Sequence, residues 1–311
     1  METTTSSTNS STLYTRPLEF TLFETITLII SLSTIFIVLL FSIATNIIAI
    51  RIFLTKKLTT PKLLYISISV SDLIFLLTSL FSIFIDSSQI LNFLINHISA
   101  FVSTYTMALI AFHRYKAIAY PMQNQPGRKV GKSVIISIVL IWILSIAFST
   151  LFQDFNIFGP TPEENTFFSQ MCRLVSTPVK ATKHVPFFTL IMMVIFPLAM
   201  GLVFSLLAIY KLSFHGTENN IIKRKQLKSV FIILIVIVTF GVCWIPVSVY
   251  FAVEGVLSGG GGCDYNYVLY AIFGVLLMIQ FTANPIIFWA MDSGFRNGVT
   301  LIWEKLIKLI K

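Results

Sequence analysis

Four polar side chains lie inside long apolar stretches of this sequence and are its first candidates for chemistry. Asp72 is a carboxylate, and Asn46, Ser103 and Asn284 could supply further oxygen or amide groups. A buried carboxylate with neutral oxygens is the ligand set that a small hard cation such as sodium prefers. The same residues could instead form a structural hydrogen-bond network between helices. The residues alone leave both interpretations open.

The stretches that hold these residues are long enough to cross a membrane. A spanning helix needs about 20 mostly apolar residues, and seven stretches nearly free of Asp, Glu, Lys and Arg meet that requirement. Asp72 is the only permanently charged residue inside any of them. The predicted spans are residues 25–50, 63–85, 87–113, 133–153, 184–210, 229–253 and 265–291.

The composition supports the same class of protein. Of the 311 residues, 56% are hydrophobic and 11% are charged, whereas a soluble globular domain carries about 25% charged residues. Only three cysteines are present, which excludes a small secreted module built on disulfides. We therefore predict an all-α membrane protein, a seven-transmembrane helix bundle.

The distribution of charge predicts the orientation of the bundle. Of the 22 basic residues, 18 fall in alternate loops and the C-terminal segment, which would lie on one side of the membrane. Short cytoplasmic loops collect Lys and Arg. We expect a multi-pass plasma-membrane protein with the N-terminus outside and the C-terminus in the cytoplasm. The net charge of +9 is then explained by topology, so nucleic-acid binding has no remaining support.

The two ends of the chain have distinct compositions. Residues 1–24 read as an extracellular tail without a signal peptide, with a glycosylation sequon at Asn9. The seven-helix bundle would occupy residues 25–292. In residues 293–311 apolar and charged side chains alternate at helical spacing, which favours an amphipathic helix on the inner leaflet of the bilayer over an incomplete eighth span.

Prolines in three different spans predict hinges. Pro197, Pro246 and Pro285 each remove a backbone hydrogen bond, which bends a helix. A channel, a transporter or a receptor could use such bends. Arg114 at the inner end of the third span could, taken alone, be a snorkelling boundary residue.

Short motifs that follow one another along the chain help to distinguish between a channel, a transporter and a receptor. In order, they are Thr45-Asn46, the run from Leu64 to Asp72-Leu73, His113-Arg114-Tyr115, Trp142, Phe196-Pro197, the stretch from Phe240 to Trp244 and Pro246, and Asn284-Pro285 with Phe288. Each motif is weak alone, but together and in this order they resemble those of a rhodopsin-like (class A) G-protein-coupled receptor. The amphipathic end resembles the eighth helix of that family.

The resemblance implies roles for these residues. Arg114 would meet a heterotrimeric G protein, and Asp72 with Ser103 would hold an allosteric sodium ion that favours the inactive state. No other cofactor and no enzymatic activity are implied. The G-protein coupling and switch set would be His113, Arg114, Tyr115, Trp244, Pro246, Phe240, Pro197, Asn284, Pro285 and Phe288.

Departures from the family pattern modify these expectations. His113 stands where the family has an acid beside Arg114, so the resting ion pair is lost and we expect raised basal signalling. Phe288 replaces the motif tyrosine. Gln89 stands where the family usually has a cysteine in the third helix, so the usual disulfide of the family cannot form. The resemblance then implies a bridge between Cys172 and Cys263 instead.

The ligand is expected in the outer halves of the helices. Asn96 occupies the position where monoamine receptors carry an aspartate, so a cationic amine has lost its anchor, and an extracellular neuropeptide is the leading hypothesis. A lipid or other small molecule is an alternative, and each pocket residue could equally be helix packing. The candidate ligand-binding residues are Gln89, Asn96, His97, Phe187 and Glu254.

The rival from another class is a seven-helix ion-coupled transporter or channel that uses Asp72. Such a protein would carry several ionisable residues along a pathway, or repeated halves. Neither feature is evident in this sequence. The balance therefore favours a receptor.

Overall fold

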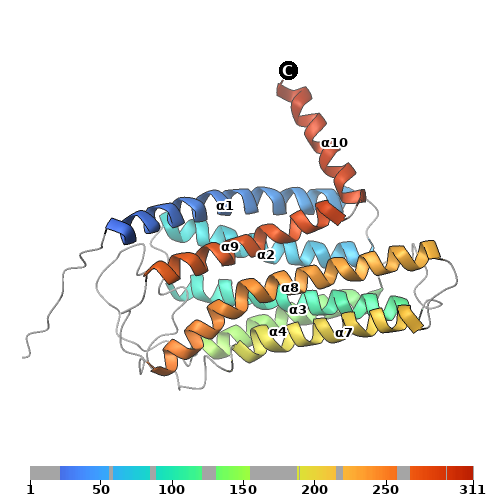
Figure 1. Cartoon of the computed structure of the whole chain (residues 1–311), viewed down its shortest axis with the longest axis horizontal. Helices are drawn as coiled ribbons and strands as arrows, with labels where there is room; N and C mark the ends of the chain where they lie inside the picture. Colours follow the sequence, from blue (N-terminus) through green and yellow to red (C-terminus); the bar gives the residue numbers. More distant parts are fainter. Residues whose placement is uncertain are drawn as a thin grey trace, which may run out of the picture.

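The computed structural model contains the seven predicted spans. It describes residues 22–55, 59–84, 89–120, 131–154, 188, 190–214, 220–257, 267–291 and 293–310. The elements are α1 (Leu22–Thr55), α2 (Thr60–Phe84), α3 (Gln89–Ala119), α4 (Lys132–Asp154), η2 (Ile191–Ile195), α7 (Phe196–Phe214), α8 (Asn220–Leu257), α9 (Tyr267–Met291) and α10 (Ser293–Ile310). Figure 1 shows the long helices side by side, which confirms the helical bundle.

Several helices are longer than the apolar stretches that predicted them. The sixth span was placed at residues 229–253, but α8 begins at Asn220 and includes Lys223, Arg224, Lys225 and Lys228. Hydropathy detects only the part of a helix that suits lipid, whereas the hydrogen-bonded backbone continues into water. The basic end of α8 therefore extends the bundle beyond its apolar core.

The third helix is the centre of the bundle. α3 packs against α2, α4, α7 and α8, and 67% of its spanning window is buried, against 17% for α4. The main core joins α3 to its neighbours through Leu64, Ile68, Phe101, Met107, Ile110, Val194, Ile237 and Phe240. The apolar side chains left on the outside of α4, such as Leu140 and Leu144, are what a lipid environment requires.

The predicted prolines occupy three helical elements. Pro246 lies inside α8 and Pro285 inside α9. Pro197 is the second residue of α7, which follows the π-helical turn η2 directly. Figure 1 shows α8 changing direction along its length, as expected when proline removes a backbone donor.

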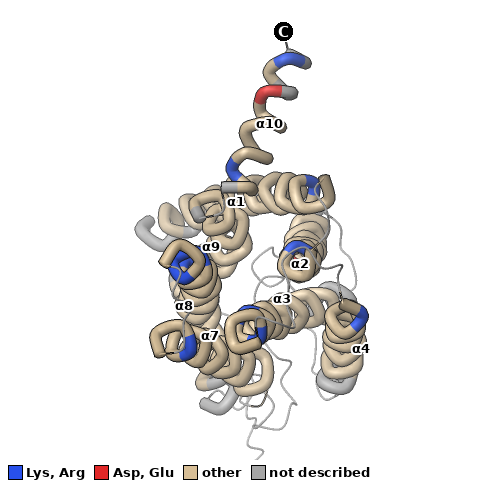
Figure 2. The backbone as a smooth tube through the Cα atoms, turned by 90° about the vertical axis from the view of Figure 1, so that its right-hand side faces the viewer, with Lys and Arg blue, Asp and Glu red and all other residues tan. Residues whose placement is uncertain are grey.

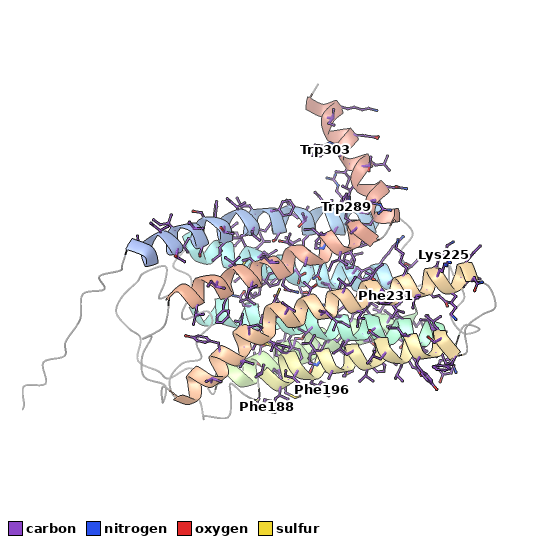
Figure 3. The ribbon with its side chains drawn as sticks, in the orientation of Figure 1. Phe188, Phe196, Lys225, Phe231, Trp289 and Trp303 are labelled. Carbon is purple, nitrogen blue, oxygen red and sulfur yellow. The ribbon has the colours of Figure 1, made fainter. Side chains whose placement is uncertain are left out.

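The amphipathic end forms α10, which leaves the bundle at a steep angle near α1 and α9 (Figure 1). Its apolar residues Phe295, Val299 and Ile302 pack with Ile52 and Phe53 of α1. Trp303 is 65% exposed on the projecting part, labelled in Figure 3. An exposed tryptophan beside lysines suits a bilayer surface.

Close contact between α10 and α1 depends on Gly298. A Cβ at this position would lie 2.7 Å from Cγ2 and 3.2 Å from Cγ1 of Ile52. These atoms are close to the branch point of the side chain and cannot easily move aside. We predict that Gly298→Ala destabilises the folded protein by about 1–3 kcal/mol through overpacking, measured as a lower melting temperature of the purified protein.

Gly241→Ala is the matched control for that prediction. The new methyl group would make ordinary contacts of 3.6 Å with Ile245 and Leu198, and alanine favours a helix over glycine by about 1 kcal/mol. Its melting temperature should stay level or rise. Equal melting temperatures for Gly298→Ala and the unmodified protein would contradict the close-packing argument.

Candidate functional site

Asp72 is the centre of a polar network buried in the bundle. Its carboxylate is 0% exposed. The Ser103 hydroxyl of α3 donates to Oδ1 at 2.6 Å, and Asn284 Nδ2 of α9 donates to Oδ2 at 3.0 Å. A charge in an apolar bundle is stable only with such partners. The structure thus brings together the three residues of the predicted cation site from three helices.

A second set of contacts joins α1 to α9. Asn46 Nδ2 donates to the carbonyl oxygens of Ser42 and Phe281, each at 3.0 Å. Phe281 lies four residues before Pro285, so its carbonyl has lost the backbone donor that a regular helix would provide. Asn46 replaces that donor from the neighbouring helix. The hydroxyl groups of Ser42 and Thr282 pair beside it.

Buried polar residues follow one face of α3 toward its N-terminal end. Asn96, Ser99, Ser103 and Thr106 recur at spacings of three and four residues, and each is at most 7% exposed. Asn96 Oδ1, Ser99 Oγ and Thr106 Oγ1 have no hydrogen-bond partner among the described residues. Buried polar atoms need partners, and ordered water or an ion would supply them.

The donor set around Asp72 fits a hard monovalent cation. It consists of one carboxylate and the Ser103 hydroxyl, with the Ser71 hydroxyl 2.7 Å from that of Ser103. Ser99 places an unpartnered oxygen one turn further along the same face. In the described part of the chain no group of three or more His, Cys, Asp or Glu residues is gathered, as a transition-metal site would need.

The predicted switch residues of α8 contact both the core and α9. The rings of Phe240 and Trp244 stack with centroids 5.6 Å apart. Trp244 Nε1 donates to Gln280 Oε1 at 3.4 Å, which links α8 to α9. Gln280 lies one turn before Asn284, so this link adjoins the Asp72 network. Pro246 is exposed on the outside of α8.

The predicted coupling residues lie at the basic end of the bundle. His113, Arg114 and Tyr115 are half-buried, and Tyr115 stacks with Phe204 at 6.2 Å. Among the described residues no carboxylate forms an ion pair with Arg114. Figure 2, viewed from this end, shows the basic residues at the helix ends. They are Arg51, Lys62, Arg114, Lys116, Lys132, Lys211, Lys223, Arg224, Lys225, Lys228 and Arg296.

Phe288 belongs to an aromatic cluster that connects α9 to three other helices. Its ring centroid lies 4.4 Å from that of Tyr65 in α2 and 6.0 Å from that of Phe53 in α1. Phe295 of α10 lies 6.3 Å away. Phe288 is 3% exposed, so a fully apolar ring fills this position without an unmet hydroxyl.

The candidate ligand residues are only partly described. Asn96 is buried and His97 is half-buried in α3. Gln89 and Glu254 lie in α3 and α8, but their side chains are outside the described set. Phe187, and with it the predicted disulfide and glycosylation residues Cys172, Cys263 and Asn9, lie outside the described residues. Cys243 is buried with a free thiol, as expected of a small apolar packing residue.

Sequence reasoning missed three polar residues near the site. Ser99 and Gln280 went unnoticed although each lies four residues from a predicted site residue, Ser103 and Asn284 respectively. That helical spacing was the available signal. Ser71, adjacent to Asp72 in sequence, reaches the network through Ser103.

Comparison with known proteins identifies relatives that are receptors. The chain is 29% identical over 217 residues to the substance-K receptor of Canis lupus familiaris, a match that covers 66% of this chain and 54% of the relative. It is 29% identical over 216 residues to the neuromedin-K receptor of Rattus norvegicus, covering 64% of this chain and 44% of the relative. The chain thus spans about half the length of these relatives.

A family model covers most of the bundle. The model of the 7 transmembrane receptor (rhodopsin family) matches residues 45–288, a range that runs from the start of the Asn46 motif to Phe288. This is a family of receptors and not a class of enzymes. Its match agrees with the seven apolar helices of a multi-pass membrane protein. The chain belongs to the rhodopsin family of seven-transmembrane receptors.

Proposed function

We propose that this chain is a plasma-membrane receptor that binds an extracellular peptide and activates a heterotrimeric G protein. In this arrangement the N-terminus is outside, the ligand binds at the outer halves of the helices, and the basic end faces the cytoplasm. The names of the substance-K and neuromedin-K receptors support a peptide ligand. The excess of Lys and Arg at one end supports the orientation.

The observation that carries the proposal is the series of contacts through the bundle. It begins at Trp244 and Gln280 and continues along α9 to Asn284, which binds Asp72. Phe288 lies one further turn along α9, in the aromatic cluster near the basic end. A ligand that changes the position of Trp244 would therefore bias packing at the inner end, which is a population shift between two arrangements.

Sodium is the ion that we propose for the Asp72 site. Asp72 and Ser103 would bind it, with Ser99 as a further oxygen donor. The ion would supply positive charge to a carboxylate that otherwise depends on two neutral donors. It would stabilise the packing seen here, because its ligands come from both α2 and α3, and Asp72 is also bound by Asn284 of α9.

The first test is ligand-dependent signalling. Cells that express the receptor are exposed to a neuropeptide panel that includes substance K and neuromedin K, and G-protein activation is recorded. We expect a peptide response that Arg114→Ala lowers on the order of tenfold, the effect of losing a charged hydrogen bond, with unchanged surface expression.

Arg51→Ala is the matched control, because Arg51 is an exposed arginine at the same end of the bundle. Its response should equal that of the unmodified receptor. Activation by a lipid extract but by no peptide would overturn the peptide assignment. A peptide response that survives Arg114→Ala unchanged would overturn the coupling role.

The sodium assignment predicts a salt-specific stability. The melting temperature of the purified ligand-free receptor should be about 2–4 °C higher in sodium chloride than in choline chloride at equal ionic strength. Asp72→Asn should remove that difference. Ser149→Ala, which changes a buried serine in α4, should retain it. The same sodium response in Asp72→Asn would exclude this site.

The missing ion pair at Arg114 predicts basal activity. His113→Asp would return an acid beside the arginine and should lower ligand-free G-protein activation by about two- to fivefold, the effect of a partly exposed ion pair. His113→Asn, which adds no charge, is the control and should leave the basal signal high. A basal signal equal to that of cells without receptor would refute the expectation.

A further inference from the structure

The outer surface of α8 changes from apolar to basic toward its N-terminal end. Phe231, Ile235 and Val238 are exposed at spacings of four and three residues, so they form one lipid-facing stripe along the helix. Extending the helix backward places Arg224 and Lys228 within about 60° of Phe231. Both cations are exposed. They therefore continue the lipid-facing stripe and do not point into the bundle.

Two exposed aromatic rings at the end of α7 mark the depth of this change in the membrane. Tyr210 and Phe214 contact each other with ring centroids 4.7 Å apart. Leu212, which lies between them in sequence, packs in one cluster with Leu227 and Val230 of α8. The rings are thus level with the point where the α8 stripe becomes basic. Aromatic rings gather at membrane–water interfaces, where the lipid head groups lie.

Three positive charges lie within five residues at this end of α8. Arg224, Lys225 and Lys228 are exposed, and in the part of the chain that the structure describes no carboxylate forms an ion pair with them. Figure 2 shows basic residues at this end of α8, and Figure 3 labels Lys225 there. Like charges at this spacing repel one another. An anionic partner at the same position would therefore be attracted by all three.

A phosphate-bearing lipid head group fits this surface. The Arg224 guanidinium can bind a phosphate through two parallel hydrogen bonds, and the lysine ammonium groups add charge without a fixed geometry. Three cations match a head group with several phosphates better than one with a single net charge. The acyl chains of the same lipid would lie against the apolar stripe that begins at Phe231.

We propose that the N-terminal end of α8 binds a polyphosphoinositide lipid through Arg224 and Lys228, with Lys225 at the edge of the site. The bound head group holds this end of α8 at the membrane surface. The site lies on the outer side of the bundle, whereas Arg114 is half-buried in α3. Its location in the inner leaflet rests on the orientation proposed for the receptor, but lipid binding itself does not.

Binding of a short-chain lipid is the direct test. Dioctanoyl phosphatidylinositol bisphosphate is titrated into the purified receptor in neutral detergent, and the Kd is measured by thermophoresis. Arg224→Gln and Lys228→Gln should each weaken binding about fivefold, the contribution of one cation near anionic head groups. Lys223→Gln is the matched control, because this half-exposed lysine is rotated by about 100° from Arg224. It should change the Kd by less than about twofold.

Two other ligands test the class of the bound molecule. Dioctanoyl phosphatidylserine has one net charge and should bind about tenfold more weakly or worse. Inositol trisphosphate is the same head group without acyl chains, and it should bind about tenfold more weakly because it buries no apolar surface against Phe231 and Ile235. Equal affinity for inositol trisphosphate would overturn the lipid site. Equal affinity for phosphatidylserine would overturn the assignment to a head group with several phosphates.

The double variant Arg224→Gln, Lys228→Gln separates a lipid from a protein partner. Its lipid affinity should fall about twenty-fivefold, the product of the two single effects, at an unchanged melting temperature. If it kept the lipid affinity of the unmodified receptor and lost only G-protein activation, the basic stripe would belong to the G protein and the proposal would be wrong. Equal effects of Lys223→Gln and Arg224→Gln would refute the lipid-facing site. The titrations use neither peptide nor G protein, so their failure is distinct from a failure of the proposed receptor function.

Discussion

The structure depends on one constraint, which is that a backbone or side-chain polar group inside a bilayer must find its partner within the protein. Asp72 satisfies it with Ser103 and Asn284, from two other helices. Asn46 satisfies it for a carbonyl that Pro285 has left without a donor, and the Tyr105 hydroxyl of α3 bonds to the Met192 carbonyl, whose donor Pro197 has removed. The polar contacts that stabilise the bundle are therefore concentrated where the apolar sequence is interrupted.

Pro246, the third proline, differs from the other two in the environment of the carbonyl that it leaves without a backbone donor. Pro246 and Val242, whose carbonyl lies four residues before it, both have exposed side chains on the outside of α8. Among the described residues no side chain from a neighbouring helix donates to that carbonyl. A change in the bend of α8 at this point would break no such cross-helix bond. The bends at Pro197 and Pro285 are thus held by side-chain donors from other helices, whereas the bend at Pro246 in α8 is not.

The bundle and the Asp72 site were predictable because both depend on local composition. An isolated carboxylate in an apolar stretch needs polar partners, and Ser103 and Asn284 were polar residues inside other apolar stretches. The hydrogen bond from Tyr105 to the π turn was not predictable. A proline indicates that a hydrogen bond is lost, but the donor that replaces it comes from a distant helix whose packing no local pattern encodes. The helical conformation of the basic end of α8 was not predicted, because hydropathy detects only the part of a helix that lies in lipid.

The contacts between α1 and α9 also bear on how the chain is assembled. Asn46 and Phe281 are separated by 235 residues, and Ser42 and Thr282 by 240. Contacts of such high sequence separation form late, after most of the chain is available. Because α1 precedes α9 in the chain, Asn46 has the Ser42 carbonyl of its own helix as a partner from the start, but it lacks the Phe281 carbonyl until α9 has been synthesised. A chain that stops before α9 would therefore leave this amide group without its second acceptor inside the membrane, where water cannot replace it.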